Sequence, residues 1–79
     1  MNLYLLEQVE NTTYDTFDAM VVAAETKEKA RTILPPERHI EWGDKYSSWA
    51  SDPSYVTAIF IGTGDHESGE IILASFNAG

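Results

Sequence analysis

The chain has 79 residues, a formal net charge of −8 and no cysteine. A chain of this length forms a single domain, residues 1–79, that buries only about 60% of its unfolded surface, which leaves little room for a large internal active site. Without cysteine there is no disulfide framework, no thiolate metal site and no cysteine nucleophile.

The distribution of charge narrows the classes of partner. All five Lys and Arg residues lie between positions 27 and 45, whereas the 13 acidic residues are spread along the chain. So few cations disfavour nonspecific binding to nucleic acid, which depends on neutralising phosphates. An acidic surface suits a partner protein with a basic surface, or it simply keeps a small protein in solution.

The first residues lack the basic and apolar regions of a secretion signal, and no stretch approaches the ~20 apolar residues of a membrane span. We therefore expect a soluble protein of the cytoplasm with no membrane partner.

Two strands are predicted at the start of the chain. Residues 3–9 alternate, with Leu3, Leu5 and Val9 on one face and Tyr4, Leu6 and Gln8 on the other. The polar residues 10–15 predict a turn. Residues 20–24 form an apolar run with adjacent valines, which favours a strand. A hairpin of these two strands is the simplest topology.

The only well-defined helix is predicted from Thr26 to Leu34. Thr26 has an N-cap side chain, and Ala30, Ile33 and Leu34 fall on one apolar stripe while Lys27, Lys29 and Arg31 point to solvent. Two prolines, at 35 and 36, end it. So short an amphipathic helix needs a sheet to pack on.

The second half predicts one further helical turn and two further strands. A short turn of helix over residues 44–49 and a turn at 52–54 precede a strand at 55–61, whose two apolar faces suggest a central position. The polar loop 62–69 then leads into a strand at 70–76 as a second hairpin. The fold class is therefore α+β, a four-stranded antiparallel sheet of order ββαββ with the amphipathic helix on one face.

No catalytic or metal constellation is assembled. Gly62-Thr63-Gly64 lacks the third glycine or the Gly-Lys-Ser/Thr that a nucleotide-binding loop needs, so a plain loop is favoured. The adjacent residues 65–67, Asp-His-Glu, would rarely converge on one ion. A Ser-His-Asp triad can be drawn on paper, but there is no nucleophile elbow. We expect no enzyme activity, no cofactor and no metal.

Two groups of residues are candidates for a binding surface. The first combines aromatic rings with a cation and could stack a base or form a protein hot spot, although core packing is the commoner role of tryptophan: Arg38, Trp42, Tyr46 and Trp49. The second is an acidic and aromatic patch on the first hairpin, for which an ordinary solvated turn is the commoner explanation: Tyr14, Asp15 and Asp18.

The chain also resembles a group of small bacteriophage-encoded accessory proteins. The resemblance rests on the start Tyr4-Leu5-Leu6-Glu7-Gln8, on the segment from Tyr14 through Glu25 with Ala30-Arg31, and on the ending Ile72-Leu73-Ala74-Ser75-Phe76-Asn77-Ala78-Gly79. It implies context only: such proteins often act by binding in the cytoplasm of the host cell, for example by blocking host defence.

The leading hypothesis is a non-enzymatic inhibitor that binds a host factor with a basic surface, through an acidic and aromatic surface of its own. A second hypothesis is an oligomeric sponge, in which a homo-oligomer holds a signalling nucleotide between Trp42, Trp49 and the cations at 31, 38 and 45. A third is a minor virion or assembly protein.

Overall fold

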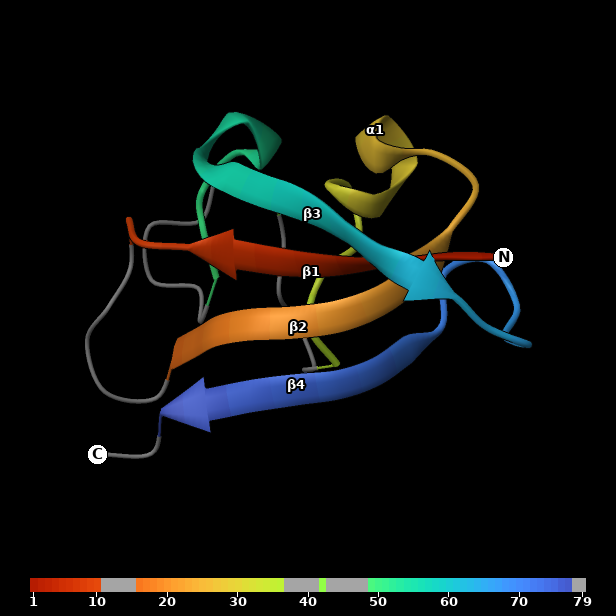
Figure 1. Cartoon of the computed structure of the whole chain (residues 1–79). Helices are drawn as coiled ribbons and strands as arrows, with labels where there is room; N and C mark the ends of the chain where they lie inside the picture. The colour runs from red at the N-terminus through yellow and green to blue at the C-terminus, as the bar shows by residue number, and fades with distance from the viewer. Residues whose placement is uncertain (11–15, 37–41, 43–48, 78–79) are drawn as a thin grey trace.

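The computed structural model describes residues 1–10, 16–36, 42 and 49–77, with the side chains of 76 and 77 left aside. Its elements follow one another along the chain as Figure 1 shows: β1 (Asn2–Gln8), β2 (Thr16–Ala24), α1 (Lys27–Ala30), the short 3₁₀ helix η1 (Pro53–Tyr55), β3 (Val56–Thr63) and β4 (Ile71–Asn77). The predicted α+β class, with a four-stranded antiparallel sheet and a short helix, is confirmed.

The sheet has the strand order β3-β1-β2-β4. The predicted hairpin of β1 and β2 is confirmed and forms the centre of the sheet, with β3 pairing to β1 and β4 pairing to β2, all antiparallel. Two predictions were wrong: β3 is an edge strand, and β3 and β4 are not a hairpin but lie at opposite edges (Figure 1).

The segment between β3 and β4 runs across one end of the two central strands. Gly64 donates its N–H to the carbonyl oxygen of Met1 at 3.1 Å, and Gly69 donates to that of Ala23 at 2.8 Å. Ala23 in turn donates to the carbonyl oxygen of Glu70 at 2.9 Å. Backbone bonds to both central strands therefore carry this segment from one edge of the sheet to the other.

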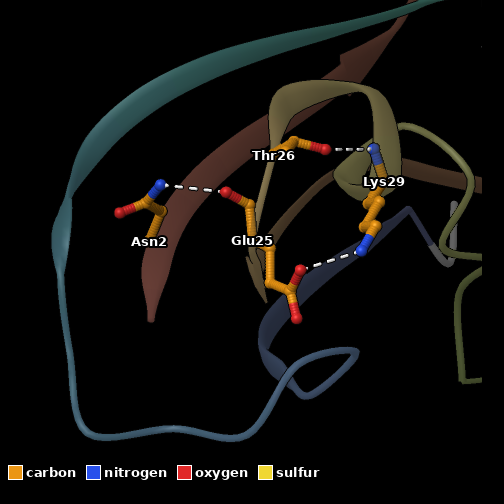
Figure 2. Close-up of polar contacts among 4 residues, drawn as sticks. All are labelled: Asn2, Glu25, Thr26 and Lys29. Carbon is orange, nitrogen blue, oxygen red and sulfur yellow. Dashed lines mark hydrogen bonds and ion pairs between the residues drawn. The ribbon is translucent and has the colours of Figure 1, made fainter.

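The start of α1 agrees with the sequence. Thr26 has extended backbone angles, and its hydroxyl accepts a hydrogen bond from the N–H of Lys29 at 3.1 Å, as an N-cap does. Figure 2 shows this bond beside the ion pair of Lys29 Nζ with Glu25 Oε2, at 2.8 Å. Asn2 Nδ2 donates to the Glu25 carbonyl oxygen at 3.2 Å, which fastens the corner to β1.

The helix ends sooner than predicted, at Ala30 and not Leu34. The N–H of Ile33 bonds the carbonyl oxygen of Ala30, three residues back, at 3.1 Å, and such bonds tighten the chain before Pro35. Four residues are too few to present a stripe, yet Ile33 and Leu34 still pack against the core. The solvent position predicted for Arg31 was wrong, because its guanidinium bonds two backbone carbonyls.

The core lies on the α1 side of the sheet. Its buried residues come from β1, β2, α1, β3 and the segment before η1, where Trp49 is only 1% exposed: Tyr4, Leu6, Phe17, Met20, Val22, Ala24, Ala30, Trp49, Ala50, Val56 and Ala58. Figure 1 shows residues 31–36, which follow α1, passing behind β1 and β2. Within the described ranges, no helix has the length and apolar character that crossing a membrane requires.

Candidate functional site

A row of four apolar side chains crosses the sheet on the face opposite the core. The strand register places Leu5 opposite both Val21 and Ile59, and Val21 opposite Leu73. Residues directly opposite in an antiparallel pair point to the same face. Ile59, Leu5, Val21 and Leu73 therefore form one row across all four strands, which we call the apolar row.

The apolar row is open to solvent at both ends. Ile59 is 48% exposed and Leu73 is 65% exposed, while Leu5 and Val21 between them are partly buried by their neighbours. The strand neighbours Tyr4, Leu6 and Val22 alternate onto the other face and are buried. We call the face that carries the apolar row the open face.

Acidic side chains lie on either side of the apolar row. Glu7 is exposed and pairs with Ala19 and Thr57 in the neighbouring row of the open face. At the other end, the segment 64–70 approaches the face at Leu3: a Cβ added to Gly64 would lie 3.1 Å from Leu3 Cδ1. This segment exposes three carboxylates, those of Asp65, Glu67 and Glu70.

The acidic segment is ordered by its own hydrogen bonds. Glu70 Oε2 lies 2.9 Å from His66 Nδ1 and accepts the N–H of Glu67 at 3.2 Å. A shallow hollow is lined by residues 65–68 and 70. No set of three or more His, Asp or Glu side chains that could hold a metal ion is found in the part of the chain that the structure describes.

The described cations lie elsewhere. Lys27, Lys29 and Arg31 belong to α1 or follow it directly, on the core side of the sheet. The hydrogen bond and the charge of Lys29 lower the pKa of Glu25, which keeps that pair ionised. The open face therefore presents apolar area and negative charge, with no Lys or Arg among its described residues.

The binding residues predicted from the sequence do not form one site among the described residues. Trp49 is in the core, and Trp42 is half-buried and packs against it, which agrees with the commoner role of tryptophan. Asp18 is exposed at an irregularity of the β2–β4 pairing. Four further candidates lie outside the described residues, as does the helical turn expected over 44–49: Tyr14, Asp15, Arg38 and Tyr46. None of the described candidates belongs to the apolar row.

One sequence feature related to the apolar row, the two apolar faces of the β3 segment, led to a wrong prediction. The two apolar faces of the strand around Ile59 indicated a central strand, but Ile59, Phe60 and Ile61 are each about half exposed at an edge, at 48%, 56% and 51%. Ile59 lies on the open face, whereas Phe60 is paired with Tyr4 and lies on the other face, so β3 exposes apolar area on both faces at this edge. Large exposed apolar patches mark interaction sites.

Comparison with known proteins adds no assignment: no family model, curated protein or solved structure matches the chain.

Proposed function

We propose that this protein acts without catalysis, by binding a partner protein through the open face. The observation that carries the proposal is the apolar row with carboxylates on either side of it. Buried apolar side chains at the centre of an interface supply most of its binding energy, while charges at the rim set the on-rate and the choice of partner. The partner that fits has an apolar contact area with Lys or Arg around it.

The chemistry of the open face argues against two other partners. Nucleic acid carries phosphates, which the acids of this face repel. The anionic cytoplasmic leaflet of a membrane would be repelled for the same reason. A basic protein surface gains from those carboxylates and also covers Ile59 and Leu73, the two most exposed members of the row.

The resemblance to bacteriophage accessory proteins suggests which partner to look for. A host factor whose basic surface is occupied by the open face would lose access to its own substrate or partner, and inhibition by occupation needs no reaction. Binding of a defence factor in the host cytoplasm is the form of the proposal that we would test first.

The sponge hypothesis finds less support among the described residues. It needs exposed rings beside available cations, but Trp49 is 1% exposed and Arg31 is engaged with backbone carbonyls. A virion component remains a separate proposal, which the presence of the chain in purified particles would support.

The test is capture of a partner from a host lysate, compared between two charge variants. Leu73→Glu places a carboxylate in the apolar row, and Thr32→Glu adds the same charge at an exposed position after α1, away from the open face. We expect one host protein to be retained by the wild type and by Thr32→Glu, to be lost with Leu73→Glu, and to elute as salt rises, because salt screens rim charges.

Equal retention by Leu73→Glu and the wild type would contradict the use of the open face. Recovery of no host protein in repeated captures, together with turnover of a substrate by the pure chain, would contradict the function itself. Circular dichroism of both variants checks that each is folded.

A further inference from the structure

The outer edge of β4 lacks the charged side chains and prolines that often protect an edge strand. Residues 71–77, Ile-Ile-Leu-Ala-Ser-Phe-Asn, contain no charge and no proline. Monomeric proteins commonly place lysine, proline or a covering segment at such an edge, because its unpaired N–H and C=O groups can pair with another chain. An edge without charge and without proline can accept a further strand.

The backbone of Ala74 faces this outer edge. Ala23 exchanges hydrogen bonds with the chain entering β4, so its backbone points towards β4. The N–H and C=O groups of successive residues in a strand point to alternate sides, so those of Val21 and Ala19 also point towards β4. Their partners Leu73 and Ser75 direct their own backbone groups towards β2. Ala74 between them points outward. Within the described residues it makes no hydrogen bond outside the β2 ladder.

The opposite edge of the sheet, β3, is protected at its start. Arg31 Nε donates to the carbonyl oxygen of Val56, the first residue of β3, at 3.0 Å. Lys27 and Arg31 together line a hollow against residues 56–58 of that strand. Figure 1 shows α1 and η1 beside β3, while β4 has neither beside it. Two cations and a short helix therefore stand over the start of the β3 edge.

We propose that β4 pairs antiparallel with β4 of a second copy of this chain, which joins the two sheets into one. The pairing is isologous, so it closes as a two-fold dimer. The cations and the helix over the start of β3 disfavour a head-to-tail contact of β3 with β4, which would continue into a fibre. The apolar row of each copy then continues, through Leu73, into the row of its partner.

Charge explains why a second copy fits at β4 in spite of its net charge. Each chain carries −8, but β4 itself carries none, so the two copies meet along their uncharged strands. The remaining repulsion acts over longer distances and is screened by salt, with a Debye length of about 8 Å at physiological ionic strength. Dimerisation is therefore favoured by added salt, the opposite of the proposed binding to a basic partner.

The test uses pure protein in sedimentation equilibrium over a range of concentration and salt, and so does not depend on the proposed function. We expect a species of about twice the 8.8 kDa chain mass, more populated at higher salt. Ser75→Lys puts an edge lysine on β4 and should weaken the dimer by at least about tenfold in dissociation constant.

Thr57→Lys is the matched control. Thr57 lies in the same cross-strand row as Ser75, connected through Glu7 and Ala19, but on the β3 edge. The substitution should therefore leave the dimer unchanged. A wild-type chain that stays monomeric at high concentration and salt would overturn the proposal. So would a dimer that survives Ser75→Lys, or one that Thr57→Lys breaks instead.

Discussion

The guanidinium of Arg31 donates from Nε to the carbonyl oxygen of Val56 at 3.0 Å, across 25 positions of the chain. Its Nη2 donates to the carbonyl oxygen of Pro53 at 2.9 Å. The planar guanidinium reaches both acceptors from one orientation, which the single ammonium of lysine cannot do. Arg31 therefore ties the end of α1 to η1 and to the start of β3.

Arg31→Lys should lower the free energy of unfolding by about 1–2 kcal/mol, because hydrogen bonds from a charged donor are strong and lysine keeps at most one of the two. Urea unfolding followed by circular dichroism measures the change. Lys27→Ala, which removes an exposed cation of the same helix, should stay within about 0.5 kcal/mol of the wild type. An unchanged urea midpoint for Arg31→Lys would show that the two hydrogen bonds of the guanidinium do not stabilise the fold.

Asp52 should make stability depend on pH in the acid range. It is the N-cap of η1, and hydrogen bonding from the side chain and then the N–H of Ser54 lowers the pKa of its carboxyl. The pKa of Asp52 in the folded state therefore lies below that in the unfolded state, which is about 3.9. The contribution of Asp52 is fully present above the unfolded pKa and is lost as the pH falls through the folded pKa.

Asp52→Asn keeps a capping side chain but cannot titrate, so it isolates this effect. Melting temperatures of the two proteins should differ most near neutral pH and converge below about pH 4. Ser54→Ala removes one donor to the carboxylate and should shift the convergence to higher pH. A difference that stays constant from neutral to acid pH would be incompatible with the lowered pKa.

The local elements could be predicted from the sequence because each rests on short-range physics. Alternation gave the two faces of β1, the threonine side chain gave the start of α1, and Asp52-Pro53 gave the turn before β3. The strand order depends on distant contacts instead. Both apolar faces of β3 are consistent with a central strand or with an edge strand beside an open face, and periodicity cannot separate them.

The candidate site was missed for the same reason. Leu5, Val21, Ile59 and Leu73 become neighbours only when the register of three strand pairs is known. Arg31 was misplaced because its acceptors, Pro53 and Val56, are brought to it by the crossover from β2 to β3. Trp49, by contrast, went where the usual behaviour of tryptophan in a small chain predicts.

The carboxylate of Glu10, just after β1, bonds Ser51 in the segment after Trp49, and we call this pair the clamp. Glu10 accepts from the N–H of Ser51 at 2.9 Å through Oε2 and from its hydroxyl at 2.7 Å through Oε1. Glu10→Gln leaves one acceptor and should cost about 1 kcal/mol of stability. Ser51→Ala removes only the hydroxyl bond and should cost less.

The double variant decides whether these costs share one origin. If the clamp is the cause, the two changes together should cost less than their sum, because the second removes a bond already weakened. Strict additivity in thermal or urea unfolding would mean that the residues act separately.

The burial of Trp49 leads to a spectroscopic prediction that also bears on the sponge hypothesis. In Trp42→Phe the only tryptophan left is Trp49, which is 1% exposed within the core. A side chain removed from water should emit at short wavelength, resist quenching by iodide, and show no change when cyclic nucleotides or nucleoside phosphates are added. Urea should restore both the long-wavelength emission and the quenching. A folded Trp42→Phe protein whose emission responded to a nucleotide would reinstate a ligand site at Trp49, because only a ring that the ligand can reach, or a core that opens to admit it, could report the addition.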